Sequence, residues 1–327
     1  MKVNILTENN YNHSINNLTR SIAYYQMFES INADVNVYVE GEKNCSEILE
    51  VNNVNFEYKN WHSKYSSVKE SDIIVIDSNK ASIDLYNKFR KKAKTPIFID
   101  DALRLKYPKG IVINGMIDID KFSINQKSKS KYLLGIEYHL LQKPFWEREQ
   151  KILKIEIENI LVSLCTNNNK LTYNIIKELA EVFPYINIHV ILPYFCNDNN
   201  QHENYQFKNI RYYKIINAKQ YKNLINKCDI AISGGGETLY ELTSSYIPII
   251  AILETEEQYV NINGFSKRVM IDYVKKTDNQ LITNIILSVK KFDNIIERIQ
   301  LIENQKKFHQ LTCSKEKILE EILQYNN

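Results

Sequence analysis

The 327-residue sequence has little of what marks several large classes of protein. Its five cysteines lie far apart and form no CxxC pair, which argues against a zinc site or a disulfide framework and favours a reducing cytoplasm. No apolar run approaches the ~20 residues needed to cross a membrane, so no integral membrane segment is expected. The formal net charge of +3 is too small to indicate nucleic acid as the main ligand.

Short apolar runs alternate with segments of helical period along most of the chain. This alternation predicts an α/β fold with parallel sheets covered on both faces. The predicted strands are Val3–Leu6, Val35–Val39, Ile73–Ile76, Ile97–Ile99, Ile111–Ile113, Asn159–Leu164, Ile188–Leu192, Ile210–Lys214, Ile230–Ser233 and Ile249–Leu253. The predicted helices include Leu18–Ile31, Ser82–Lys92, Leu171–Phe183, Ala218–Lys227 and Thr238–Ser245.

The alternation pauses in a polar, charged stretch between Asp120 and Glu158. We therefore predict two Rossmann-like domains, residues 1–150 and residues 151–327, with a helical C-terminal stretch over Asn294–Tyr325 that packs on the outside, or alternatively crosses back to the first domain. Two such domains are expected to face each other across a cleft at the carboxyl ends of their strands, where open α/β sheets bind ligands.

Glycine is also scarce: the chain has eight, and three of them are consecutive in SGGGETLYE, residues 233–241. The stretch follows an apolar run and opens an amphipathic one, which predicts a turn between a strand and a helix. A helix start offers free N–H groups, and glycines let a diphosphate approach the backbone, so we expect a diphosphate site with added hydroxyl donors from Ser233 and Thr238. A tight turn without a ligand is the alternative, since the stretch is neither a P-loop nor a GxGxxG motif.

Glu241 lies three residues after Thr238, about one helical turn further along. A carboxylate beside a phosphate site is unfavourable unless it has another role, and accepting hydrogen bonds from ribose hydroxyls is such a role. A capping or surface glutamate is the alternative.

The segment SGGGETLYELTSSYIPIIAI, followed by Gln258 and Asn261, resembles the nucleotide-binding signature of GT-B enzymes related to the peptidoglycan N-acetylglucosaminyltransferase. It is still more similar to the UDP-sugar hydrolase family of pseudaminic acid biosynthesis and the related spore-coat polysaccharide proteins. Three further stretches resemble that family in order and spacing: IVIDS (74–78), IFIDDAL (97–103) and YLLGIEYHLLQKPF (132–145). The resemblance implies a GT-B-like fold.

Carried over residue by residue, the resemblance implies roles for the turn and its neighbours. The residues that would hold the diphosphate are Gly234, Gly235, Gly236 and Thr238. Glu241 would bind the ribose, Gln258 and Asn261 would face the sugar, and the loop 215–219 would lie near the base.

The loop after the first predicted strand departs from the family, which has Gly-x-Gly-His there and an arginine three residues after its catalytic histidine. Here the loop reads ENNYNHSINNLTRS. If Arg20 matches the family arginine, which we assign to the sugar, Asn17 takes the catalytic position, and Ser14 and Asn16 replace the glycines. A second family loop, Gly-Gly before an acidic residue, reads Cys165-Thr166-Asn167.

The departure matters because an amide cannot act as a general base. His13, four residues before Asn17, would replace the family histidine if the loop folds differently; an exposed loop histidine is the alternative. Asp77, Asp100 and Asp101 follow predicted strands and are candidates to orient a sugar or to act as base. Helix N-capping is the alternative for these aspartates and suits the pair Asp77-Ser78 well.

Three functions follow as hypotheses, all in bacterial surface glycan or nonulosonic acid synthesis. The first is a hydrolase that releases a free sugar and UDP from a UDP-activated amino sugar. The second is a GT-B glycosyltransferase that moves a sugar from a UDP- or CMP-activated donor to a glycan or protein acceptor. The third is a non-catalytic nucleotide-sugar-binding protein. None of these requires a metal ion or a cofactor, and we expect neither.

Overall fold

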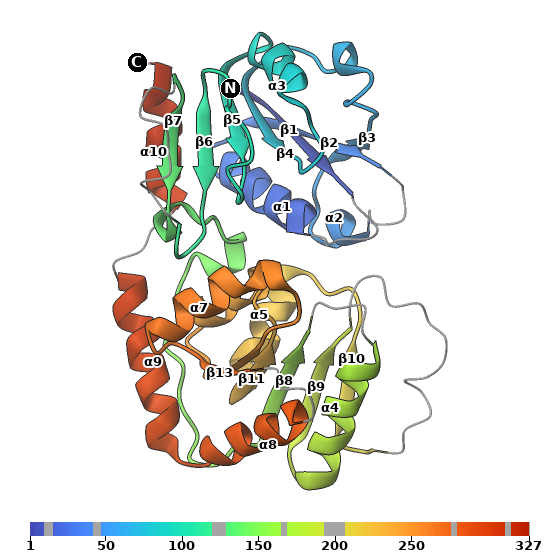
Figure 1. The fold of residues 1–327 in the computed structure, drawn as a ribbon. Coiled ribbons are helices and arrows are strands. Elements are labelled where there is room, and N and C mark those ends of the chain that lie inside the picture. The colour runs from blue at the N-terminus through green and yellow to red at the C-terminus, as the bar shows by residue number, and fades with distance from the viewer. Residues whose placement is uncertain are drawn as a thin grey trace. The chain divides into compact units, whose positions relative to one another are not determined.

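The computed structural model describes residues 1–9, 16–41, 47–119, 129–164, 169–192, 207–275, 280–310 and 315–326 (Figure 1). The chain divides into two compact units. Unit 1 comprises Met1–Trp146 and Leu311–Asn327, and unit 2 comprises Glu147–Gln310. Each unit is built on its own sheet of parallel strands.

The sheet of unit 1 has its described strands in the order β3-β2-β1-β4-β5-β6-β7. The strands are β1 (Lys2–Glu8), β2 (Asp34–Glu40), β3 (Phe56–Tyr58), β4 (Ser71–Asp77), β5 (Ala93–Ile99), β6 (Ile111–Asn114) and β7 (Lys131–Leu134). The helices are α1 (Asn16–Glu29), α2 (Glu47–Val51), α3 (Ile83–Arg90) and α10 (Lys315–Leu323). β1 and β4 are buried along most of their length, because a parallel sheet is covered on both faces.

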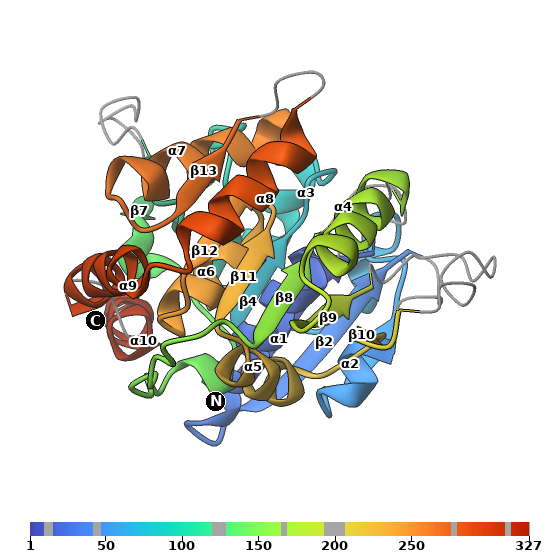
Figure 2. The same ribbon diagram turned by 90° about the horizontal axis from the view of Figure 1, so that it is seen from below.

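The sheet of unit 2 has the described order β10-β9-β8-β11-β12-β13. The strands are β8 (Asn159–Ser163), β9 (Asn187–Ile191), β10 (Ile210–Tyr213), β11 (Ile230–Ser233), β12 (Ile249–Ile252) and β13 (Asp272–Val274). The helices are α4 (Asn169–Val182), α5 (Ala218–Lys227), α6 (Glu237–Ser244), α7 (Tyr259–Lys267), α8 (Leu281–Lys291) and α9 (Ile295–Gln310). α4 and α8 lie side by side (Figure 2) and bury apolar side chains in a common core with β8 and β11.

Every strand predicted from an apolar run is present, and α5 has the predicted bounds. The sequence analysis missed β3, β7 and β13. Each of them lies at the edge of its sheet and is short. Such edge strands carry partly exposed polar residues, so they lack the continuous apolar run that identifies a central strand.

In each sheet the strand order reverses at the first strand of the unit. β1 lies between β2 and β4, and Thr7 pairs with Asp77. β8 lies between β9 and β11, and Ser163 pairs with Ser233. The carboxyl ends of these central strands are the places where open α/β sheets bind ligands.

The C-terminal helix α10 belongs to unit 1, although the sequence analysis placed residues 151–327 in one domain. Its apolar residues Ile318, Leu319 and Ile322 are buried, and Glu321 forms an ion pair with Lys131 of β7. The helical pattern predicted an amphipathic helix but carried no information on which unit covers its apolar side.

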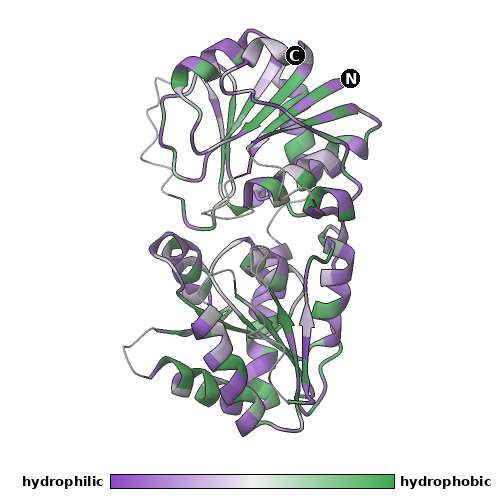
Figure 3. Cartoon of the chain, turned by 90° about the vertical axis from the view of Figure 1, so that its right-hand side faces the viewer, coloured by the Kyte–Doolittle hydropathy of each residue, from purple (hydrophilic) through white to green (hydrophobic). Residues whose placement is uncertain are grey.

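Hydrophobic residues are concentrated in the strands of both units, while the helices present alternating hydrophilic and hydrophobic sides (Figure 3). This is the pattern of a sheet packed between layers of helices. Within the described ranges, no helix combines the length and the apolar character needed to cross a membrane.

Candidate functional site

The glycine turn follows β11 and leads into α6, as predicted, and two of its glycines are explained by the protein itself. A Cβ atom on Gly234 would lie 1.9 Å from Oε2 of Glu254. A Cβ atom on Gly235 would lie 2.6 Å from Cγ1 of Ile262 and 2.9 Å from the carbonyl oxygen of Gln258. Gly235 is therefore required by the backbone of the segment after β12, whereas the neighbours of Gly234 are the ends of flexible side chains that can move.

Gly236 differs from the other two glycines. A Cβ atom built on it has no heavy atom within 4 Å, so it faces open space. Gly236 is the N-cap residue of α6, and no side chain caps the helix there. Its φ of −81° suits any residue, so neither packing nor conformation requires a glycine. The start of α6 at Gly236 is therefore the part of the turn that a ligand can approach.

Two amide side chains hold the backbone of Gly235, one at its N–H and the other at its carbonyl. Oε1 of Gln258 accepts hydrogen bonds from the Gly235 N–H at 3.0 Å and the Glu254 N–H at 3.2 Å. Nδ2 of Asn261 donates to the Gly235 carbonyl at 2.9 Å, while its Oδ1 accepts from the Tyr240 hydroxyl at 2.6 Å. These contacts fix the turn, and the sugar-facing role of Gln258 and Asn261 stays a prediction.

The two hydroxyl residues of the motif lie in different surroundings. Ser233 is fully buried, and its hydroxyl donates to the carbonyl of Gly234 at 3.0 Å. Thr238, in the first turn of α6, is half-buried. Thr238 is therefore the more accessible hydroxyl beside the open start of the helix, and both diphosphate assignments stay predictions.

Glu241 lies one helical turn beyond the start of α6 and is partly exposed. Its carboxylate has no hydrogen-bond or ion-pair partner among the described residues, whereas its backbone carbonyl accepts from the hydroxyls of Ser244 and Ser245. Burial, with a smaller contribution from the charge of Glu237, raises the pKa of the Glu241 carboxyl to about 8. A perturbed carboxyl group without a partner beside an open helix start is typical of a functional site.

In unit 1, the predicted polar residues meet at the carboxyl ends of β1, β4 and β5. Arg20 of α1 donates from Nε to Asp77 Oδ2 at 2.7 Å and from Nη2 to Asp77 Oδ1 at 2.8 Å. Its Nη1 donates to Oδ2 of the more exposed Asp101 at 2.5 Å. The structure thus brings Arg20, Asp77 and Asp101 together, with Asp77 buried and bound through both oxygens.

The capping alternative for the aspartates is wrong. The N-cap of α3 is Ser82, whose hydroxyl accepts from the Leu85 N–H, and Asp77 instead binds Arg20. Asp100 is buried and accepts hydrogen bonds from the Arg104 N–H at 2.8 Å and the Tyr107 hydroxyl at 2.6 Å. Asp100 therefore fixes the loop after β5.

Asn17 also lies at this edge. It is buried, and its Nδ2 donates to the backbone carbonyl of Asp77 at 3.3 Å. His13 and Ser14 of the same loop, and Cys165, Thr166 and Asn167 after β8, lie outside the described residues. In the loop 215–219, Asn217 caps α5 and Gln220 completes a capping box. The role of this loop beside a base stays a prediction.

Three further polar residues lie at the edge of unit 1: Ser78, which the sequence analysis considered only as a capping residue, and Glu8 and His62, which it missed. They come from separate parts of the chain and hydrogen-bond or lie within ion-pair distance of one another. No spacing in the sequence joins them, because only the sheet register places Glu8 beside Ser78.

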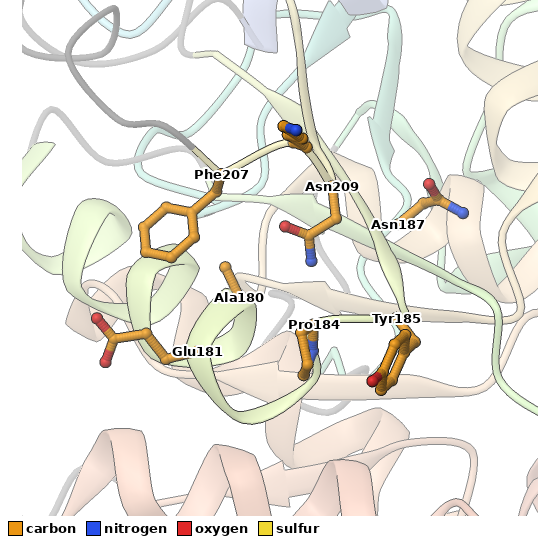
Figure 4. A pocket seen from close by; sticks show the side chains of 8 residues that line it. Ala180, Glu181, Pro184, Tyr185, Asn187, Phe207 and Asn209 are labelled. Atoms are coloured by element: carbon orange, nitrogen blue, oxygen red, sulfur yellow. The ribbon is translucent and has the colours of Figure 1, made fainter.

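A separate hollow in unit 2 lies at the opposite edge of its sheet, where β9 begins (Figure 4). Its lining includes Pro184 and Tyr185 from the segment after α4, Asn187 at the start of β9, and Phe207. It therefore lies at the amino ends of the strands, away from the glycine turn. Within the described ranges, no group of three or more His, Cys, Asp or Glu side chains is placed to hold a metal ion.

No family model matches the chain. The chain is 23% identical over 309 residues to the Helicobacter pylori protein named pseudaminic acid cytidylyltransferase and UDP-2,4-diacetamido-2,4,6-trideoxy-beta-L-altropyranose hydrolase. That alignment covers 93% of this chain and 52% of the relative, so the chain spans about half of the relative's length. It is also 24% identical over 340 residues to the uncharacterized protein MJ1062 of Methanocaldococcus jannaschii, covering 94% of this chain and 68% of that protein.

Solved structures show the fold class. The glycotransferase of kitacinnamycin matches with a TM-score of 0.65 at 10% identity, covering 98% of each chain. The spinosyn rhamnosyltransferase SpnG complexed with thymidine diphosphate matches with a TM-score of 0.61 at 9% identity, covering 98% of this chain and 99% of that one. A putative UDP-N-acetylglucosamine 2-epimerase from Listeria monocytogenes matches with a TM-score of 0.60 at 10% identity, over 92% and 90% of the two chains. The chain has a GT-B-like fold of two parallel-sheet α/β units, as predicted, and it resembles the UDP-sugar hydrolase branch in sequence.

Proposed function

We propose that this chain processes a nucleotide-activated sugar and that unit 2 binds the nucleotide. The observation that carries the proposal is Glu241, a partly exposed carboxyl group that has no described partner and a pKa raised to about 8. Ribose hydroxyls are donors that would satisfy this carboxylate. The open, uncapped start of α6 at Gly236 would receive the diphosphate.

The reaction we favour is hydrolysis of a UDP-activated amino sugar. The support is the similarity over 93% of this chain to a protein whose name includes a UDP-sugar hydrolase. In this reaction a water oxygen bonds to the anomeric carbon, and the bond from that carbon to the diphosphate oxygen breaks. The electron pair of the broken bond leaves with UDP, and the proton of the water passes to a base. Arg20 and Asp101 would orient the hydroxyl groups of the sugar.

A glycosyltransferase is the second candidate. It is favoured by the presence of Asn17 where the hydrolase family has its catalytic histidine, and by the transferases among the solved structures of this fold. The acceptor would then be a glycan or a protein in place of water. A non-catalytic nucleotide-sugar-binding protein is the remaining alternative and would bind without turnover.

The first experiment is a thermal-shift panel with UDP, CMP, CDP, GDP and dTDP. A ligand at about 100 times its Kd adds about 2.7 kcal/mol of stability, which a melting curve resolves easily. We expect a shift with UDP. Glu241→Ala should weaken UDP binding by about 1–3 kcal/mol, the scale for hydrogen bonds to a charged group. Glu178→Gln, on the exposed side of α4, is the matched control and should bind as the wild type does.

The outcomes separate the candidates. Equal affinity in Glu241→Ala and the wild type would remove the ribose assignment, and no shift with any nucleotide would remove the nucleotide site. A shift with CMP alone would favour a transferase that uses a CMP-activated sugar. If UDP binds, UDP release from a UDP-amino sugar without an acceptor favours the hydrolase, and release only with an acceptor favours the transferase.

A further inference from the structure

The Glu8–Ser78–His62 cluster lies at the carboxyl edge of the sheet of unit 1. Glu8 ends β1 and is buried, and its Oε2 accepts from the Ser78 hydroxyl at 2.6 Å. Its Oε1 accepts from the backbone N–H of Asn79 at 2.7 Å. Both oxygens of this carboxylate are thus engaged, which fixes its position.

Ser78 resembles the hydroxyl of a nucleophilic triad but its contacts exclude that role. Its proton is donated to Glu8, and its oxygen accepts hydrogen bonds from the backbone N–H groups of Lys80 at 3.1 Å and Ala81 at 2.9 Å. A hydroxyl donates one proton and accepts at two lone pairs, so this one has no free position. Ser78 is therefore a structural link between Glu8 and the turn after β4.

His62 is the member of the cluster that can exchange a proton. Its Nε2 lies 3.5 Å from Glu8 Oε2 and 3.4 Å from Ser78 Oγ, and its side chain is 25% exposed. Its ring packs edge-on against Trp61, with ring centroids 4.1 Å apart. Its backbone N–H donates to Glu40 at 2.9 Å. The ring is thus held in one orientation while part of it stays open to solvent.

The charge state of His62 follows from the groups around it. Burial, the largest cause, lowers the pKa of His62 below 6.5, and Lys80 lowers it further, while Glu40 and Glu8 oppose this by raising it. The net effect favours the neutral imidazole, which is the form that can accept a proton. With Nε2–H facing the carboxylate of Glu8, the free lone pair is on Nδ1, which has no hydrogen-bond partner among the described residues.

We propose that His62 is the general base of this chain, oriented by Glu8, and that it takes the proton that Asn17 cannot accept. The proposal rests on the proposed function. The observation that carries it is that the cluster and Asn17 lie at the same carboxyl end of β4. Ser78 directly follows Asp77, and Asn17 contacts the carbonyl of Asp77. As the water oxygen bonds to the anomeric carbon and UDP leaves, Nδ1 of His62 takes the proton of the water. The carboxylate of Glu8 then stabilises the imidazolium.

The test compares His62→Gln with Lys64→Gln, an exposed neighbour in the same loop, as control. The probes are UDP for binding and a UDP-amino sugar for turnover. We expect His62→Gln to bind UDP as the wild type does and to lose about 100-fold or more in kcat, the usual contribution of a general base. The acid limb of the wild-type kcat/KM profile should lie below pH 6.5 and should vanish in His62→Gln. Added imidazole should restore turnover to His62→Ala.

Glu8→Gln gives a readout that a purely structural role would not produce. Without the negative charge beside it, the pKa of His62 should fall, so the acid limb should move to lower pH in a variant that still melts as a folded protein. Turnover by His62→Gln with an unchanged acid limb would overturn this inference and leave the proposed function intact. A wild-type chain that binds UDP but turns over no UDP-amino sugar, with or without an acceptor, would overturn both.

Discussion

The acidic side chains at the carboxyl edges of the two sheets differ in whether they have partners within the protein. In unit 1, both oxygens of Asp77 bind Arg20, and both oxygens of Glu8 bind neighbouring donors. In unit 2, the carboxyl group of Glu241 has no described partner, and burial raises its pKa to about 8. The carboxylates of Asp77 and Glu8 thus have partners within the protein, whereas the carboxyl group of Glu241 has none among the described residues.

This difference separates residues that hold the site in its shape from residues that would contact a ligand. A paired buried charge adds shape and orientation and is costly to disrupt. A partly buried carboxyl group that has no partner in the protein is a candidate contact for a ligand that donates hydrogen bonds. Substitutions that break the buried Arg20–Asp77 pair should therefore act on folding first, and substitutions of Glu241 on binding first.

The largest expected effect is that of Arg20→Met on the stability of unit 1. The substitution leaves Asp77, which is 2% exposed, without its charged partner, and removing one member of a buried pair costs about 3–5 kcal/mol. Both tryptophans of the chain, Trp61 and Trp146, lie in unit 1, so denaturation followed by tryptophan fluorescence reports on this unit.

Lys94→Met is the matched control for the stability of unit 1. Lys94 forms an ion pair with Asp72 in which the side chains are 77% and 36% exposed, and such surface pairs contribute little to stability because solvent screens them. If the two substitutions lower the free energy of unfolding by the same amount, the Arg20–Asp77 pair acts as a surface interaction. The contrast between the two edges would then be lost.

A smaller effect is expected from alanine in the glycine turn of unit 2. Gly235→Ala forces a methyl group against Ile262 and the backbone of Gln258, and overpacking of this kind costs about 1–3 kcal/mol. Gly236→Ala places its methyl group in open space and should change stability by less than about 0.5 kcal/mol. Hydrogen exchange of peptides from β11 and β12 measures the change in stability in each variant.

Gly236→Ala should instead weaken UDP binding. A Gly236→Ala variant that binds UDP normally would place the diphosphate elsewhere.

The contrast also explains how much of the fold the sequence predicted. The central strands are continuous apolar runs such as Ile73–Ile76, because a strand covered on both faces needs apolar residues throughout. The edge strands β3, β7 and β13 carry no such run and were missed. The assignment of α10 to unit 1 depends on which surface its apolar side meets, and its own residues do not specify that surface.

The site was predictable only as far as neighbours in sequence define it. The order of Gly236, Thr238 and Glu241 along one strand–turn–helix unit is local, and the structure places these residues together. The reason for Gly234 and Gly235 is not local, since it lies in Glu254, Ile262 and Gln258. His62 was missed for the same reason: it lies 54 residues after Glu8, and only the folded sheet brings the two together.

The finest test of the contrast is the pH dependence of nucleotide binding. The pKa of Glu241 is raised from 4.5 to about 8, so the folded chain holds a proton there that the unfolded chain releases, and without a ligand the stability of unit 2 should fall as pH rises through this window. If Glu241 accepts the ribose hydroxyls as proposed, it does so in its ionised form, so binding should release this proton. Affinity should then rise about tenfold per pH unit between about pH 6 and 7 and level off above about pH 8.

Calorimetry in two buffers of different ionisation heat measures the released proton directly. A UDP-sugar is the suitable probe, because its diphosphate has no terminal group that titrates in this range. Glu241→Gln should remove both the proton release and the slope, because an amide does not ionise. A wild-type affinity that stays flat from about pH 6 to about pH 8 would mean that Glu241 is not the group that accepts the ribose hydroxyls. The unpaired carboxyl group would then be a cost of folding at this edge, and not a contact prepared for a ligand.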